Sequence, residues 1–110
     1  MQNSRIFLLA KTSILVYALG NDQAADMLQD NIILLQTLEL IDKEELDEAL
    51  QYIAEEKKHN SADFSFKPTK KEINDTVQAL RKLAKVCTVE ATSRSLLEAA
   101  EFIDDFWQES

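Results

Sequence analysis

His59 is the only histidine of the chain and Cys87 is its only cysteine, so these two side chains are the first candidates for chemistry. The stretch from Glu56 to His59 has the Glu-x-x-His spacing of carboxylate-bridged metal centres in helical bundles. Such a centre needs a second element of this kind and further inward glutamates. With one histidine, the sequence favours a solvated or hydrogen-bonded His59 over a metal ligand. We therefore expect no metal and no other cofactor.

Cys87 would need a neighbouring base and an oxyanion site to act as a nucleophile, and the only imidazole lies in another segment. Its position fits the apolar stripe of a helix, where a cysteine packs as a small inert side chain. A lone thiol cannot form an intramolecular disulfide or a zinc site of several thiolates. This cysteine usage predicts a cytoplasmic location.

Catalysis by carboxylates or by a phosphate-binding loop is also disfavoured. The adjacent acids Asp104 and Asp105 would point apart on a helix, and general acid–base work requires a pocket that raises the pKa of one of them. A single glycine cannot build a phosphate-binding loop. The sequence thus predicts a protein that is not an enzyme and that works by binding.

The net charge of −8 opposes attraction to nucleic acid and to anionic membranes, because both need a dense cationic surface. It favours a basic partner instead. The hydrophobic fraction of 45% is ordinary for a globular protein, so the chain should fold. A length of 110 residues fits one helical domain over residues 1–110.

The elements that must position any site are predicted to be helices. One glycine and one proline leave little material for the tight turns of hairpins and sandwiches. Capping boxes at Asp42 and Thr69 mark two helix starts, and Ser95 begins a third candidate box. We expect an all-α fold, a small bundle of about five helices with one longer loop at about 59–68. The expected helices cover 4–19, 23–40, 43–58, 69–87 and a last segment that begins between 88 and 95.

The first predicted helix is apolar on most sides, which is typical of a central or self-associating helix. A targeting or membrane role is disfavoured, because Lys11, Thr12 and Ser13 interrupt the apolar stretch and about 20 apolar residues are needed to span a bilayer. We expect this helix to be central. We also expect a homodimer through it or through the aromatic C-terminal end, with a monomer as the alternative.

Aromatic and acidic side chains are the candidates for binding a partner. In the loop, Phe64 and Phe66 alternate with polar residues, so an extended chain would place both rings on one side. These rings either hold the loop on the core or form a clamp for a partner. Likewise, the acidic helical faces are either solvated surface or binding surface. The candidate partner-binding residues are Phe64, Phe66, Phe102, Phe106, Trp107, Glu44, Glu48 and Glu55.

The pattern favours a small acidic protein–protein interaction module, such as an adaptor, a chaperone-like protein or a neutraliser of the antitoxin or immunity type. The alternative is a small regulator that contacts nucleic acid through a basic face between residues 67 and 85. This stretch contains six bases and two acids. This face could instead pack against an acidic helix. The six bases are Lys67, Lys70, Lys71, Arg81, Lys82 and Lys85.

Overall fold

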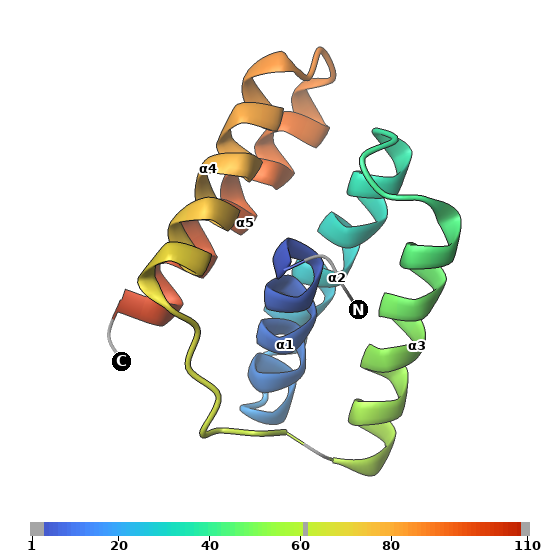
Figure 1. The fold of residues 1–110 in the computed structure, drawn as a ribbon, viewed down its shortest axis with the longest axis vertical. Helices are drawn as coiled ribbons and strands as arrows, with labels where there is room; N and C mark the ends of the chain where they lie inside the picture. The colour runs from blue at the N-terminus through green and yellow to red at the C-terminus, as the bar shows by residue number, and fades with distance from the viewer. Residues whose placement is uncertain (1–3, 61, 109–110) are drawn as a thin grey trace. The chain divides into compact units, whose positions relative to one another are not determined.

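The computed structural model describes residues 4–60 and 62–108, with the side chains of residues 4 and 5 excepted. This part of the chain forms five helices and no strand, which confirms the all-α prediction (Figure 1). The longer loop covers residues 60–69, one residue later than predicted at each end. The helices are α1 (Ser4–Ala18), α2 (Asp22–Thr37), α3 (Lys43–His59), α4 (Lys70–Val86) and α5 (Glu90–Gln108).

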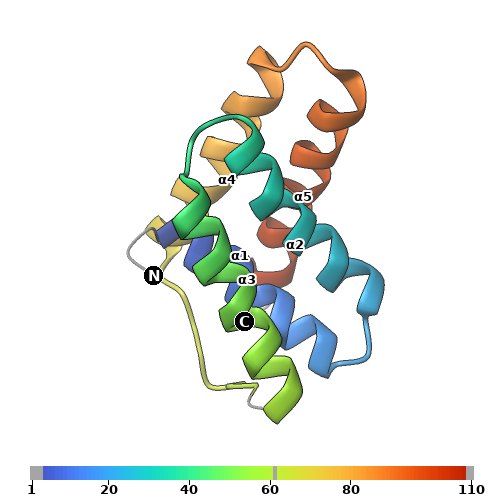
Figure 2. The same cartoon turned by 90° about the vertical axis from the view of Figure 1, so that its right-hand side faces the viewer.

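The contacts between residues divide the chain into two compact units. The N-terminal unit, Met1–Phe66, holds α1, α2 and α3, and the C-terminal unit, Lys67–Ser110, is a hairpin of α4 and α5 (Figure 2). In the N-terminal unit, α1 packs against both α2 and α3. The sequence predicts one domain over residues 1–110. The contacts do not test whether the two units unfold together in one transition, so the single domain stays a prediction.

Helix α1 is the central element of the N-terminal unit, as its apolar circumference predicts. Six of its large apolar side chains, at Ile6, Leu8, Leu9, Ile14, Leu15 and Val16, are buried, and none of them is more than 3% exposed. Most of the apolar surface that suggested self-association is therefore covered within a single chain, while Phe7 is half-buried and Tyr17 and Leu19 are exposed. The homodimer stays a prediction, and the buried part of α1 does not support it.

Two polar residues of α1, Thr12 and Ser13, are also buried, and their hydroxyl groups have hydrogen-bond partners. Thr12 Oγ1 donates a hydrogen bond to the carbonyl oxygen of Leu8 at 2.7 Å. Ser13 Oγ donates one to the carbonyl oxygen of Ala25 at 2.8 Å, and this bond joins α1 to α2. Ser13 thus serves the packing of α1 against α2, and Thr12 is satisfied within its own helix.

Helices α1 and α2 end in the same way, each with a residue in the left-handed conformation. After α1 this residue is Gly20, with φ 90°. After α2 it is Glu39, with φ 61°, and the next amide, that of Leu40, donates to the carbonyl of Leu35 at 2.9 Å. This arrangement is a Schellman motif. It ends α2 at Thr37, three residues before the predicted end.

The connection between α4 and α5 differs from the prediction in two places. Helix α4 stops at Val86, so Cys87 is a half-buried cap residue in extended geometry rather than a member of the apolar stripe. Helix α5 begins at Glu90, so the capping box predicted at Ser95 is wrong and Ser95 lies inside the helix. A tertiary contact secures this start, because Ser93 Oγ donates to the carbonyl oxygen of Ala84 at 2.8 Å.

Both remaining capping boxes form as predicted, and they should contribute measurably to stability. Asp42 accepts a hydrogen bond from the amide of Glu45, and Thr69 accepts one from the amide of Glu72. We expect Asp42→Ala and Thr69→Ala each to lower the free energy of unfolding by about 1 kcal/mol, since each leaves a helix amide without its acceptor. Urea denaturation followed by circular dichroism measures this loss. Asp47→Ala, at an exposed position within α3, is the control, and an equal loss there would refute the assignment.

Candidate functional site

A hollow of about 330 Å³ in the N-terminal unit combines acidic and aromatic side chains. We call it the acidic hollow; it is lined by Phe7, Glu48, Gln51, Tyr52 and Glu55. Four of these residues follow one another at i, i+3, i+4 and i+7 along α3, so they lie on one face of that helix. Phe7 comes from α1 and supplies an apolar wall.

The register of α3 explains why these side chains reach the surface. Ala49 and Ile53 lie among the lining residues in the sequence of α3, but they are fully buried in the core of the unit. Helical periodicity then turns Glu48 and Glu55 outward, and both are exposed. Glu44 is exposed one turn earlier on the helix, but it does not line the hollow. Of the three acids predicted to bind a partner, Glu48 and Glu55 thus line the acidic hollow and Glu44 does not.

The loop aromatics behave differently from each other. The ring of Phe66 meets that of Phe7 edge to face, with centroids 5.7 Å apart, and Lys11 Nζ lies 5.6 Å from the Phe66 centroid. Phe66 therefore holds the loop on α1. Phe64 is 61% exposed and is available to a partner. The first reading holds for Phe66, and the role of Phe64 in binding a partner stays a prediction.

A tight turn, rather than an extended strand, lies at these two rings, so the extended geometry that would place both on one side is not formed. The amide of Phe66 donates to the carbonyl oxygen of Asp63 at 3.2 Å. The hydroxyl and the amide of Ser65 both donate to the Asp63 carboxylate. These bonds favour the ionised form and lower the pKa of Asp63, with the hydroxyl as the larger cause. The turn thus carries a fixed negative charge beside Phe64.

The three predicted aromatic residues of α5 form a cluster in the C-terminal unit. Phe102 and Phe106 stack with centroids 5.9 Å apart, and Phe106 meets Trp107 edge to face at 4.8 Å. Trp107 is only 7% exposed, so most of the indole is packing surface. This cluster and the acidic hollow belong to different units, and each is a separate feature.

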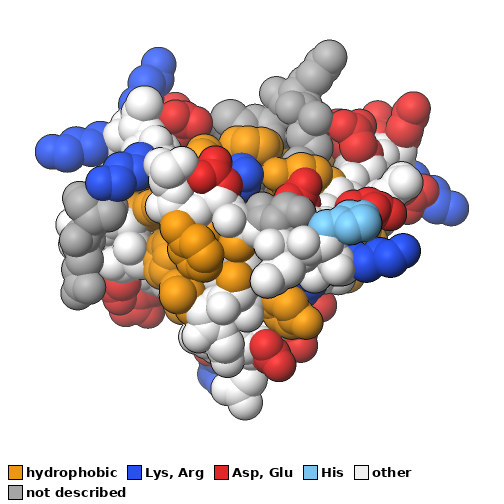
Figure 3. Space-filling model, turned by 90° about the horizontal axis from the view of Figure 1, so that it is seen from below, with side chains coloured by type: hydrophobic (Ala, Val, Ile, Leu, Met, Phe, Trp, Pro, Cys, Tyr) orange, Lys and Arg blue, Asp and Glu red, His pale blue; other side chains and the backbone are white. Residues whose placement is uncertain are grey.

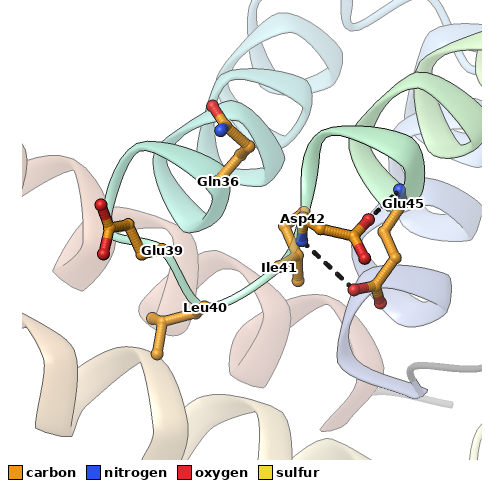
Figure 4. A pocket seen from close by; sticks show the side chains of 6 residues that line it. All are labelled: Gln36, Glu39, Leu40, Ile41, Asp42 and Glu45. Atoms are coloured by element: carbon orange, nitrogen blue, oxygen red, sulfur yellow. Dashed lines mark hydrogen bonds between the residues drawn. The ribbon is translucent and has the colours of Figure 1, made fainter.

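Two further hollows were not predicted. One, of about 340 Å³, lies at the α2–α3 connection and is shown in Figure 4. Its carboxylates at Asp42 and Glu45 are engaged in the capping box, so they serve the start of α3. The other, of about 540 Å³, lies in the C-terminal unit and is lined by Lys67, Pro68, Lys70, Ile73, Asn74, Asp104, Trp107 and Gln108. Because it joins residues from α4 and α5, no local sequence pattern could reveal it.

The six predicted bases are all exposed, and none makes an ion pair with an acid in the described part of the chain. Helix α4 packs against the acidic helix α5, but no ion pair in the described residues joins these bases to it. Elsewhere on the surface, Glu90 forms an ion pair with Arg94 at 3.2 Å, and the Glu55 carboxylate lies 3.3 Å from His59 Nε2. Figure 3 shows the histidine at the surface beside acidic side chains.

Among the described residues, no three His, Cys, Asp or Glu side chains are grouped so that they could hold a metal ion. None of the helices within those residues has the length and apolar character needed to cross a membrane. Comparison of the chain with protein-family models, with curated proteins and with solved structures finds no match.

Proposed function

We propose that the protein is a protein–protein interaction module that acts by binding rather than catalysis and that recognises a basic segment of its partner at the acidic hollow. The observation that carries this proposal is the placement of Glu48 and Glu55 on either side of Tyr52, next to Phe7. The site offers two carboxylates and two aromatic rings within one depression. This combination suits a lysine or an arginine side chain.

An arginine would be recognised through three kinds of contact. Its guanidinium group can donate hydrogen bonds to the two carboxylates, and such charge-assisted bonds are the stronger ones. Its planar head can lie against the Tyr52 ring, where a cation is attracted to the π face. Its aliphatic stem can cover Phe7. A lysine would make the same contacts with fewer directed hydrogen bonds.

The charge of the surrounding unit supports a basic partner. Residues 1–66 contain twelve acids and five bases, so most of the net negative charge of the chain belongs to the N-terminal unit. The negative field of this unit speeds encounter with a basic partner and disfavours an acidic one. An adaptor, a chaperone-like protein or a neutraliser would use this property. The proposal includes a cytoplasmic location, which the solitary cysteine favours.

A fluorescein-labelled arginine-rich peptide provides the test. We expect it to bind the wild-type protein and to bind the double variant Glu48→Gln/Glu55→Gln about tenfold more weakly, because two charge contacts of roughly 0.7 kcal/mol each are removed. Fluorescence anisotropy measures both affinities. Asp26→Asn/Asp30→Asn is the matched control, since both residues are exposed on α2 in the same unit and the charge change is identical.

An equal loss of affinity in the control variant would show general attraction to the unit, and it would overturn the assignment to the hollow. Capture from the native host then identifies the physiological partner. We expect the wild-type protein to retain a basic protein that the Glu48→Gln/Glu55→Gln variant loses. A partner retained equally by both proteins would show that recognition occurs at another surface.

A further inference from the structure

The solvent-facing side of α4 carries a basic surface that the acidic hollow does not explain. Two groups of bases lie near its two ends, with Asn74, Asp75 and Gln78 between them. All of these residues are exposed, whereas Thr76, Val77 and Leu80 on the other side of the helix are buried. We call this the α4 basic surface; its bases are Lys70, Lys71, Arg81, Lys82 and Lys85.

Two acids, Glu72 and Asp75, also lie on α4, so this helix carries an excess of bases rather than bases alone. Its five bases make no ion pair with an acid anywhere in the described ranges. Ten residues separate Lys71 from Arg81, which corresponds to about 15 Å along a helix. A helix or an extended peptide with acids at both ends can span this separation. The surface is thus complementary to an elongated acidic ligand.

A hollow adjoins the N-terminal end of this surface. It has a volume of about 540 Å³, and Lys67 and Lys70 are among its lining residues. Pro68, Ile73 and Trp107 supply its apolar lining. Asp104, which also lines it, accepts a hydrogen bond from Gln108 at 3.0 Å. An apolar side chain of moderate size could occupy this hollow while neighbouring acids meet the lysines.

We propose that the α4 basic surface and this hollow bind an acidic segment of a partner protein, with one large apolar side chain of that segment in the hollow. The charge of the surface selects acidic ligands, and the apolar lining favours a peptide. A nucleic acid is a poorer fit because the whole chain carries a net charge of −8. Trp107 is also only 7% exposed, so its ring offers no open face on which a base could stack.

Two fluorescein-labelled helical peptides of equal length and charge test this proposal. Both consist of glutamate, glutamine and alanine, and one has a single central phenylalanine where the other has alanine. We expect the phenylalanine peptide to bind more tightly, by about tenfold, because the hollow buries its ring. Binding of that peptide should change the emission of Trp107, the only tryptophan of the chain. The alanine peptide should leave this emission unchanged.

Protein variants then locate the site. Lys70→Gln/Lys82→Gln should weaken binding of the phenylalanine peptide by about tenfold through the loss of two charge contacts. Lys43→Gln/Lys58→Gln, at two exposed positions on α3, makes the same change in charge and should leave the affinity within about twofold. All four side chains are exposed, so the fold should be kept in both variants, and circular dichroism checks this.

Three results would overturn the proposal. These are equal affinity for the two peptides, equal weakening by the two double variants, and tighter binding of single-stranded or duplex DNA than of the phenylalanine peptide at physiological salt. The last result would assign the α4 basic surface to nucleic acid. The acidic hollow lies in the N-terminal unit and is proposed to bind a basic segment, whereas the α4 basic surface is proposed to bind an acidic one. The two proposals can therefore fail independently.

Discussion

Replacing Leu28 with alanine is expected to lower the free energy of unfolding by about 2–5 kcal/mol. Leu28 lies in α2 with none of its surface exposed, so the truncation removes buried methyl groups and leaves a cavity. A domain of this size is stable by only about 5–15 kcal/mol, so the loss is a large fraction of the total. Urea denaturation followed by far-ultraviolet circular dichroism measures it.

Leu40→Ala is the matched control for this prediction, because the same atoms are removed from a side chain that is 50% exposed. We expect this variant to lose less than about 1 kcal/mol, since little cavity can form at the surface. Equal losses at the two positions would contradict the burial of Leu28. A small loss at both positions would show that α2 packs loosely on α1.

Replacing Leu80 with alanine should have an effect of the same size in the C-terminal unit. Leu80 is 2% exposed in α4, and its truncation should also cost about 2–5 kcal/mol. If residues 1–110 are one domain, as we propose, both units unfold in a single transition. Leu28→Ala should then shift the transition reported by Trp107 fluorescence as much as the one reported by circular dichroism, although Trp107 lies in the other unit.

Separate transitions for the two signals, with Leu28→Ala moving only one of them, would contradict the single domain. Leu97→Ala is the control for Leu80→Ala, because Leu97 is 46% exposed on α5 in the same unit. Its loss should stay below about 1 kcal/mol. If Leu97→Ala lowered the free energy of unfolding as much as Leu80→Ala, burial of the side chain would not explain the size of the loss.

Local sequence was sufficient for most of the helical framework. The starts of α3 and α4 were predictable from Asp42 and Thr69, because a capping box forms between residues only three positions apart. The turn after α1 was predictable from Gly20, which adopts a positive φ without the strain that a side chain would cause. The outward placement of Glu48 and Glu55 followed from helical periodicity alone. In each case, the deciding interaction lies within one or two helical turns.

Tertiary structure decided the remaining boundaries and the shape of both candidate sites. Glu39 ends α2 in a left-handed conformation that glutamate does not predict. Helix α5 begins at Glu90 without an N-cap side chain of the kind that marks the starts of α2, α3 and α4. Phe7 reaches the acidic hollow from α1, more than 40 positions before Glu48. Ile73 and Trp107 both line the hollow of the C-terminal unit, because α4 and α5 pack together. Periodicity places a side chain on a helical face, but only the packing of distant segments determines which faces meet.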